Sequence, residues 1–179
     1  MIACMEEHWG NPSSLYTLGQ EANELLQSAR ERIAGCIGAA AREIYFTSGG
    51  SEADNQAIRS AAYWGARRGK KHIISSAIEH HAVLHTLERL KEEGFEITLL
   101  PVGEEGIVKV SDVAAALRED TALVTIMYAN NEIGTLQPIR EIGALCREKK
   151  VLFHTDAVQA VGHVPVDVQA DQIDMLSLS

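Results

Sequence analysis

The sequence predicts an α/β fold of three layers built around a mostly parallel sheet. Its hydrophobic periodicity switches repeatedly between 2 and 3.6 residues, which is typical of strands that alternate with helices. The 179 residues are enough for one sizeable core. No internal repeat or linker-like stretch interrupts the alternation, so residues 1–179 are expected to form one layered unit.

Composition and charge exclude several classes of protein. With 46% hydrophobic and 23% charged residues, the chain is globular rather than disordered. A net charge of -9 argues against nucleic acid as a partner. No apolar run approaches the roughly 20 residues of a membrane span, and no basic and apolar leader opens the chain, so the cytoplasm is the expected location. Cys4, Cys36 and Cys146 lack the spacing of a disulfide framework or zinc knuckle.

The first predicted elements are two helices separated by a strand. Apolar residues recur at steps of three and four from Leu15 to Cys36, which predicts a helix that Gly38 helps to end. Glu43–Thr47 is predicted to be a strand. Ser51–Arg68 is predicted to be a helix, because acidic residues lie in its first turn and arginines in its last, as the helix dipole prefers.

Strands and helices continue to alternate through the rest of the chain. Gly106–Val110 is expected to be extended, and Ser111-Asp112 is expected to cap the helix that follows. Pro138 has the place of a first-turn proline. The remaining predicted elements are a strand His72–Ser76, a helix Ala82–Glu93, a strand Phe95–Val102, a helix Val113–Arg118, a strand Thr121–Tyr128, a helix Ile139–Lys149, a strand Val151–Thr155 and a strand Met175–Ser179.

Polar residues follow four of the predicted strands, at the sheet edge where open parallel sheets bind ligands. Ser48-Gly49-Gly50-Ser51 leads into a helix N-terminus, whose free N–H groups and dipole suit a phosphate, although a simple tight turn is an alternative. Neither GxGxxG nor GxxxxGK[ST] occurs, so the common nucleotide fingerprints are absent.

Two further positions indicate a cofactor rather than a metal. A carboxylate at the end of a buried strand, as at Asp156, costs free energy unless it pairs with a cation. His80 is either a capping or solvent-facing residue or a flat side chain that stacks on a ring. His80 and His81 lack a third ligand at suitable spacing, so no metal site is predicted. A phosphate site, a histidine and a carboxylate that needs a protonated partner together fit pyridoxal phosphate.

Five sequence blocks, in order, cover essentially the whole chain and carry a family resemblance: Gly10–Ser14, Phe46–Asn55, Glu79–Val83, Asn130–Gly134 and His154–Gln159. With these blocks the chain resembles the cysteine desulfurases of the NifS/IscS type, in the class V aminotransferase group of fold-type I pyridoxal phosphate enzymes. The resemblance implies that residues 1–179 are part of the large cofactor-binding domain.

The resemblance also implies individual roles. Gly50, Ser51 and Ser179 would bind the phosphate of the cofactor. His80 would stack on the ring and act as the catalytic acid–base group. Asp156 would pair with the ring nitrogen. The two positions implied to contact the phenolic oxygen are Asn131 and Gln159.

Ser179 matches the first serine of the family's Ser-x-His-Lys motif. The resemblance therefore places the Schiff-base lysine, the persulfide-forming cysteine and the C-terminal small domain outside this sequence, and the chain alone is expected to be inactive. The complete enzyme would convert L-cysteine to L-alanine and pass sulfur, through an enzyme persulfide, to iron–sulfur cluster assembly or another delivery route. A homodimer and a sulfur-acceptor or scaffold protein are the implied partners.

Other functions remain open at this point. Cofactor-binding residues do not report the substrate, so another class V enzyme, such as a selenocysteine lyase, is one alternative. A non-catalytic fragment that binds pyridoxal phosphate or phosphate is another. A nucleotide-binding domain is a distant alternative, because both fingerprints are missing.

Overall fold

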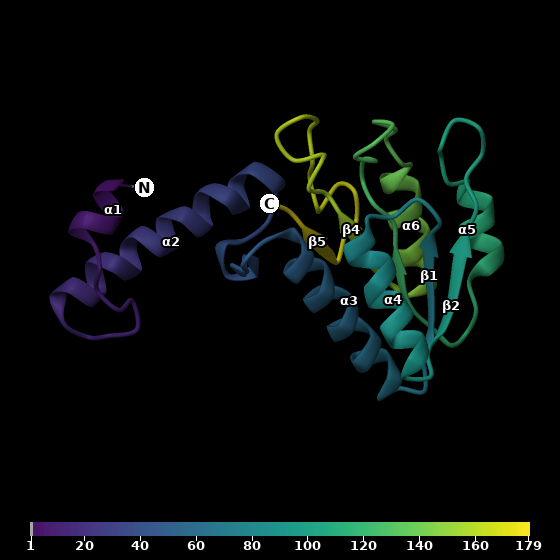
Figure 1. The fold of residues 1–179 in the computed structure, drawn as a ribbon, viewed down its shortest axis with the longest axis horizontal. Helices are drawn as coiled ribbons and strands as arrows, with labels where there is room; N and C mark the ends of the chain where they lie inside the picture. The colour runs from purple at the N-terminus through teal and green to yellow at the C-terminus, as the bar shows by residue number, and fades with distance from the viewer. Residues whose placement is uncertain (1) are drawn as a thin grey trace. The chain divides into compact units, whose positions relative to one another are not determined.

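A parallel sheet of five strands forms the centre of the computed structural model, which describes residues 2–179. The strands lie in the order β2-β1-β3-β4-β5, and every neighbouring pair is parallel (Figure 1). This confirms the predicted sheet. The strands are β1 His72–Ser76, β2 Glu96–Leu100, β3 Thr121–Thr125, β4 Leu152–Asp156 and β5 Met175–Ser177.

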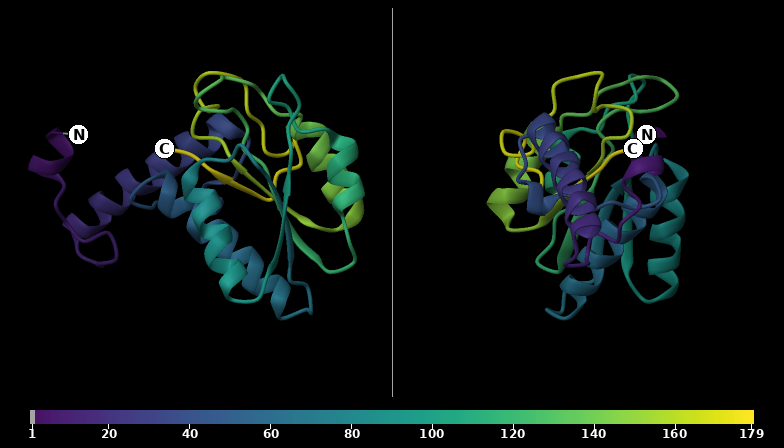
Figure 2. Two further views of the ribbon diagram at one scale, coloured as in Figure 1. Left: turned by 45° about the vertical axis from the view of Figure 1, so that its right-hand side comes forward. Right: turned by 90° about the vertical axis from the view of Figure 1, so that its left-hand side faces the viewer.

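Helices cover both faces of the sheet, as the predicted three layers require. Ile73 and Leu123 pack against α3 and α4, whereas their neighbours Ile74 and Val124 pack against α5 and α6. The helices accordingly lie on both sides of the sheet (Figure 2). All four side chains are fully buried, so each face has its own apolar core. The four helices are α3 Gly50–Ala66, α4 His81–Glu92, α5 Val110–Ala116 and α6 Ile139–Lys149.

The chain divides into two compact units, of which the second spans Thr47–Ser179 and contains the sheet. The first unit ends at Phe46 and contains two helices and a 3-10 turn. Its long helix ends at Gly38, whose left-handed φ of 71° explains the glycine. No helix within residues 2–179 is both long and apolar enough to cross a membrane. The elements of the first unit are α1 Ile2–Glu7, α2 Thr17–Ile37 and the 3-10 turn Ala41–Glu43.

The strand predicted at Glu43–Thr47 is wrong. The structure has the end of the 3-10 turn there, followed by irregular backbone. A strand requires a neighbour that accepts and donates its backbone hydrogen bonds, and within residues 2–179 no strand pairs with this segment. Tyr45 and Phe46, which lie in this segment, are 76% and 49% exposed.

The extended piece predicted at Gly106–Val110 is irregular, and α5 begins earlier than expected. Its N-cap is Lys109, not Ser111-Asp112. The side chain of Gln137 makes the backbone hydrogen bonds that a neighbouring strand would otherwise make. Its Oε1 accepts from Val108 N (2.8 Å), and its Nε2 donates to Gly106 O (2.8 Å). A side-chain amide that satisfies both backbone groups leaves nothing for a strand to pair.

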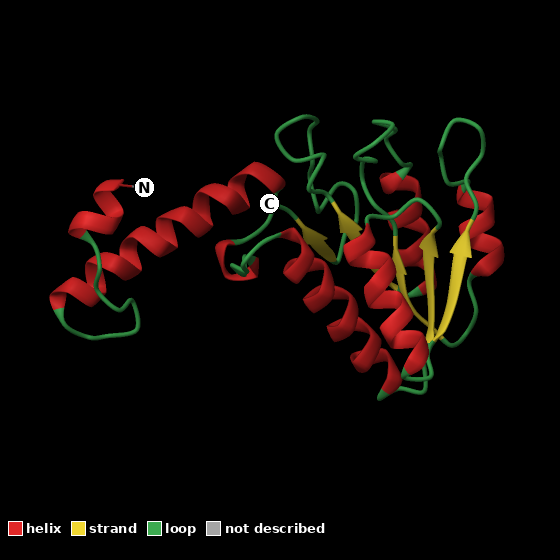
Figure 3. Cartoon of the chain, in the orientation of Figure 1, coloured by secondary structure: helices red, strands yellow, loops and turns green. Residues whose placement is uncertain are grey.

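The parallel arrangement brings the carboxyl ends of all the strands to one edge of the sheet. In Figure 3 the arrowheads of the strands mark this edge, and the loops that follow them gather beyond it. Side chains that lie far apart in the sequence therefore meet there.

Candidate functional site

Within residues 2–179, the backbone N–H groups at the N-terminus of α3 have no hydrogen-bond partners. Its first helical hydrogen bond runs from Ala53 N to Gly49 O (3.1 Å), so the N–H groups of Gly50 and Ser51 lie ahead of it. A Cβ atom on Gly50 would lie 2.9 Å from Val158 Cγ2, so glycine allows the helix to start close to the loop after β4. The free N–H groups and the positive end of the helix dipole can bind a phosphate here.

Asp156 is the last residue of β4 and is only 7% exposed. Its Oδ1 accepts a hydrogen bond from Val158 N (3.0 Å). Burial raises the pKa of this carboxyl, while the hydrogen bond and the nearby His80 ring lower it. Within residues 2–179 no lysine or arginine forms an ion pair with Asp156. The site therefore contains a nearly buried carboxylate that a cationic ligand would stabilise.

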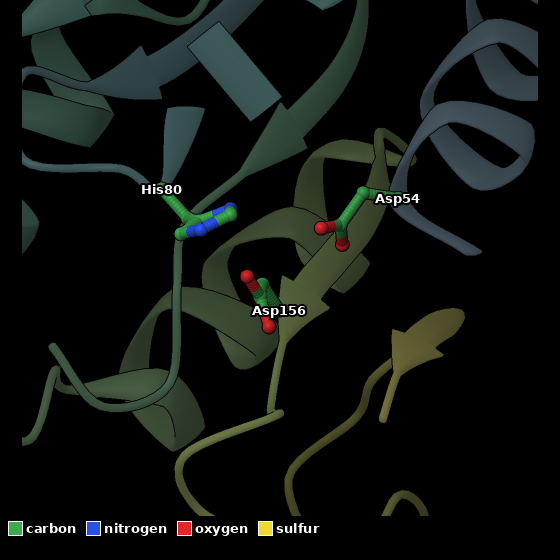
Figure 4. A group of neighbouring side chains, drawn as sticks. All are labelled: Asp54, His80 and Asp156. Carbon is green, nitrogen blue, oxygen red and sulfur yellow. The ribbon is translucent and has the colours of Figure 1, made fainter. Parts of the chain in front are cut away.

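His80 is the N-cap of α4, and its Nδ1 accepts from Ala82 N (3.2 Å). The capping interpretation of this residue is therefore confirmed. A ring nitrogen that accepts a hydrogen bond carries no proton, so the neutral ring has its proton on Nε2. The exposed His80 ring also lies beside the site. One of its ring nitrogens, one carboxylate oxygen of Asp54 and one of Asp156 are all within 4.8 Å of one another (Figure 4).

Asp54 is a residue of this site to which the sequence analysis gave no role. It is 1% exposed, and its Oδ1 has no hydrogen-bond partner within residues 2–179. Burial raises its pKa to about 7, with a further contribution from the charge of Asp156. The signal that reveals it is helical spacing: Asp54 lies on the same face of α3 as the buried Ile58 and Ala61, so the sequence places an acid on an apolar face.

Glu79 is a second buried acid without a predicted role. Its Oε1 accepts from Ser76 Oγ (2.5 Å) and from Met127 N (3.0 Å), whereas its Oε2 has no partner within the described residues. Burial is the main cause that raises its pKa to about 8. These bonds join the segment before His80 to the chain after β3.

Within residues 2–179, the two residues predicted to contact the phenolic oxygen are not linked to the rest of the site. Asn131 and Gln159 are both exposed, and no hydrogen bond links either side chain to Asp54, His80 or Asp156 in the part of the chain that the structure describes. Their role stays a prediction.

The neighbour of Asn131 shapes the turn after β3. The buried Asn130 donates through Nδ2 to Ile78 O (3.0 Å) and accepts at Oδ1 from Glu132 N (2.9 Å). These hydrogen bonds hold the Asn-Asn-Glu-Ile-Gly turn beside the segment that leads to His80.

One of the predicted phosphate residues, Ser51, lies beside open space. A pocket of about 730 Å³ lies between α3 and α4, and both Ser51 and His80 line it. Ser179 lies close to the same helix N-terminus, because a Cβ atom on Gly50 would meet Ser179 Cβ at 3.7 Å. The structure thus brings together Gly50, Ser51 and Ser179 at one side of the site, and His80 and Asp156 at the other.

The profile of the aminotransferase class-V family matches residues 1–179. Cysteine desulfurase IscS from Clostridium botulinum is 53% identical over 179 residues, which are 100% of this chain and 45% of that protein. Putative cysteine desulfurase IscS 1 from Bacillus subtilis is 54% identical over 179 residues, or 100% of this chain and 47% of that protein.

Solved structures agree with these relatives. A NifS-like protein superimposes with a TM-score of 0.95 and 38% identity over 99% of this chain and 49% of its own. SspA in complex with cysteine superimposes with a TM-score of 0.95 and 40% identity, over 99% of this chain and 51% of its own. The chain spans about half the length of the relatives it matches. With a matching profile along its full length and the predicted fold, this chain belongs to the aminotransferase class-V family.

Proposed function

We propose that this chain is the cofactor-binding portion of a pyridoxal-phosphate-dependent cysteine desulfurase. The observation that carries the proposal is the nearly buried carboxylate of Asp156, which forms no ion pair with a lysine or arginine in residues 2–179 and lies at the same sheet edge as the N-terminus of α3. A ligand with an anionic phosphate at one end and a protonated ring nitrogen at the other satisfies both features.

The residues present fit this cofactor. Gly50 and Ser51 would hold the phosphate through their backbone N–H groups and the Ser51 hydroxyl, and Ser179 would add a second hydroxyl. The carboxylate of Asp156 would accept a hydrogen bond from the protonated ring nitrogen. His80, which rises from the start of α4 beside Asp156, would cover one face of the ring.

Asn131 and Gln159 would contact the phenolic oxygen. Both side chains are exposed and carry amide groups that donate and accept hydrogen bonds, so both are available to a ligand. These two roles depend on the family resemblance alone.

The chemistry divides between the cofactor and the chain. When bound, pyridoxal phosphate supplies an electron sink that stabilises negative charge at the Cα of an amino acid. Asp156 would keep the ring nitrogen protonated. His80 would move a proton at Nε2, because its Nδ1 is engaged by the backbone of α4.

The names of the relatives support the substrate. They are cysteine desulfurases, and one solved neighbour is described in complex with cysteine. We therefore assign L-cysteine as the proposed substrate of the whole protein and a sulfur-acceptor protein as its partner, with assembly into a homodimer. The three free thiols suit a reducing compartment, and the cytoplasm is the proposed location.

The test is the binding of pyridoxal phosphate, followed by absorbance and by protein fluorescence, to the wild type, to Asp156→Asn and to a control, Asp112→Asn, at a partly exposed position in the first turn of α5. Losing a charge-assisted hydrogen bond should weaken binding by about tenfold to a hundredfold in Asp156→Asn and leave the control unchanged. Equal affinity in all three proteins would refute the assignment of Asp156. Alanine formation from L-cysteine by the whole protein then tests the substrate.

A further inference from the structure

Two carboxyl groups lie side by side at the edge of the proposed cofactor site. Asp54 comes from the first turns of α3, and Asp156 comes from the end of β4 (Figure 4). Oxygen atoms of the two groups lie within 4.8 Å of each other, and the residues are 1% and 7% exposed. Two like charges this close and this buried repel strongly, so ionising both is unfavourable.

His154, the group that faces Asp54, does not supply a compensating charge. His154 Nε2 lies 3.8 Å from Asp54 Oδ1, but this ring is fully buried, and burial lowers its pKa to about 3. Both of its nitrogens already have partners, the hydroxyls of Thr125 (2.8 Å) and Ser177 (3.0 Å). His154 is therefore neutral and cannot balance a charge on Asp54.

The other facing groups favour the ionisation of Asp156 over that of Asp54. Asp156 accepts a hydrogen bond from Val158 N and is stabilised by the His80 ring. Asp54 has only the hydroxyl of Ser177 to favour its charged form. The last facing group is the carboxyl of Glu79, which is buried and adds no positive charge.

We propose that Asp54 is a positioning residue that holds the single proton of this carboxyl pair, so that Asp156 alone carries the negative charge that faces the ring nitrogen of the cofactor. The contact between Asp156 and the ring nitrogen rests on the proposed function, whereas the sharing of one proton depends only on the geometry of the pair. The unpartnered Oδ1 of Asp54 and the neutral His154 behind it are the observations that favour this distribution.

The pair should respond to any change in the charge of Asp156. Asp54 is already buried, so a bound ligand adds little to its desolvation. A cation beside Asp156 offsets the repulsion that Asp54 experiences, and the pKa of Asp54 then falls. Replacing Asp156 with asparagine removes the same repulsion and should act in the same direction.

The experiment is a pH titration of the side-chain carboxyls by carbon-13 NMR, on the protein labelled at aspartate. Asp54→Asn identifies the signal that titrates near neutral pH by removing it. Asp156→Asn should lower the midpoint of that signal by about one pH unit or more, and added pyridoxal phosphate should lower it in the wild type. Asp112→Asn, at a partly exposed position in the first turn of α5, is the matched control and should leave the midpoint in place.

The outcomes separate the two proposals. If Asp54 titrates together with the exposed carboxyls, or if Asp156→Asn leaves its midpoint unchanged, the shared proton is refuted, while pyridoxal phosphate binding still decides the proposed function. If Asp156→Asn lowers the midpoint but pyridoxal phosphate binds without doing so, the shared proton stands and the contact between Asp156 and the ring nitrogen is refuted.

Discussion

Replacing Glu79 with glutamine should change how the stability of the protein depends on pH. In the folded protein the Oε1 atom of Glu79 accepts from Ser76 Oγ and Met127 N, and Oε2 has no partner within residues 2–179. Glutamine keeps an oxygen for both donors and has nearly the same shape, but it does not titrate. The variant therefore removes the ionisation of this position while retaining its hydrogen bonds.

The magnitude follows from the pKa of Glu79, which is about 8 in the folded protein against an ordinary value of 4.5. Between these two pH values the unfolded chain has released the proton and the folded protein has kept it. Stability therefore falls as the pH rises through this range. At about 1.4 kcal/mol for each pH unit, the whole loss is about 5 kcal/mol. Glu79→Gln lacks this loss.

The assay is the free energy of unfolding from urea titrations at a series of pH values from 4.5 to 8. The difference between Glu79→Gln and the wild type should grow by about 4 kcal/mol in favour of the variant across this range, since the group is half-titrated in one of the two states at each end. Asp54, whose pKa is also raised, is present in both proteins and is coupled to Glu79 only through a minor charge interaction. Glu88→Gln, at an exposed position of α4, is the control and should stay parallel to the wild type. Parallel curves for Glu79→Gln would refute the reasoning.

The other two predictions concern packing and thiol reactivity. A Cβ atom on Gly65 would lie 2.4 Å from Ala122 Cβ, so Gly65→Ala should destabilise the protein by about 1–3 kcal/mol in urea unfolding. Gly35→Ala, in a helix with open space around it, should not destabilise, and equal losses in both variants would contradict the packing argument. Burial raises the pKa of Cys146 to about 12, so this thiol should be alkylated only after denaturation, whereas the exposed Cys36 reacts in the folded protein. Rapid labelling of Cys146, read by peptide mass, would contradict its burial.

Much of the fold could be predicted because periodicity and end signals agree in the core elements. The bounds expected for the strand His72–Ser76 and the helix Ile139–Lys149 coincide with those observed. The strand predicted at Glu43–Thr47 is wrong because strand formation also needs a neighbouring strand with a free edge, which local sequence does not report.

The site was predictable where the residues lie directly after strands. His80 and Asp156 meet because the carboxyl ends of parallel strands share one edge, so their positions directly after strands place both at that edge. Asp54 and Glu79 were missed because their importance depends on burial. An acid in a helix or turn is usually exposed, and only the packed structure shows that these two are enclosed.

Because the five strands run in the same direction, the ligand-binding edge of the sheet lies at one end of the strands and the turns suited to insertions lie at the other. The turn between α3 and β1, which contains the exposed Gly69, lies at the opposite end of β1 from the site. A strand of five residues spans about 16 Å, so a fluorophore or an affinity tag inserted at Gly69 is held a strand length from the ligand-binding edge. The fold thereby provides a labelling position from which binding at the opposite edge can be followed without altering it.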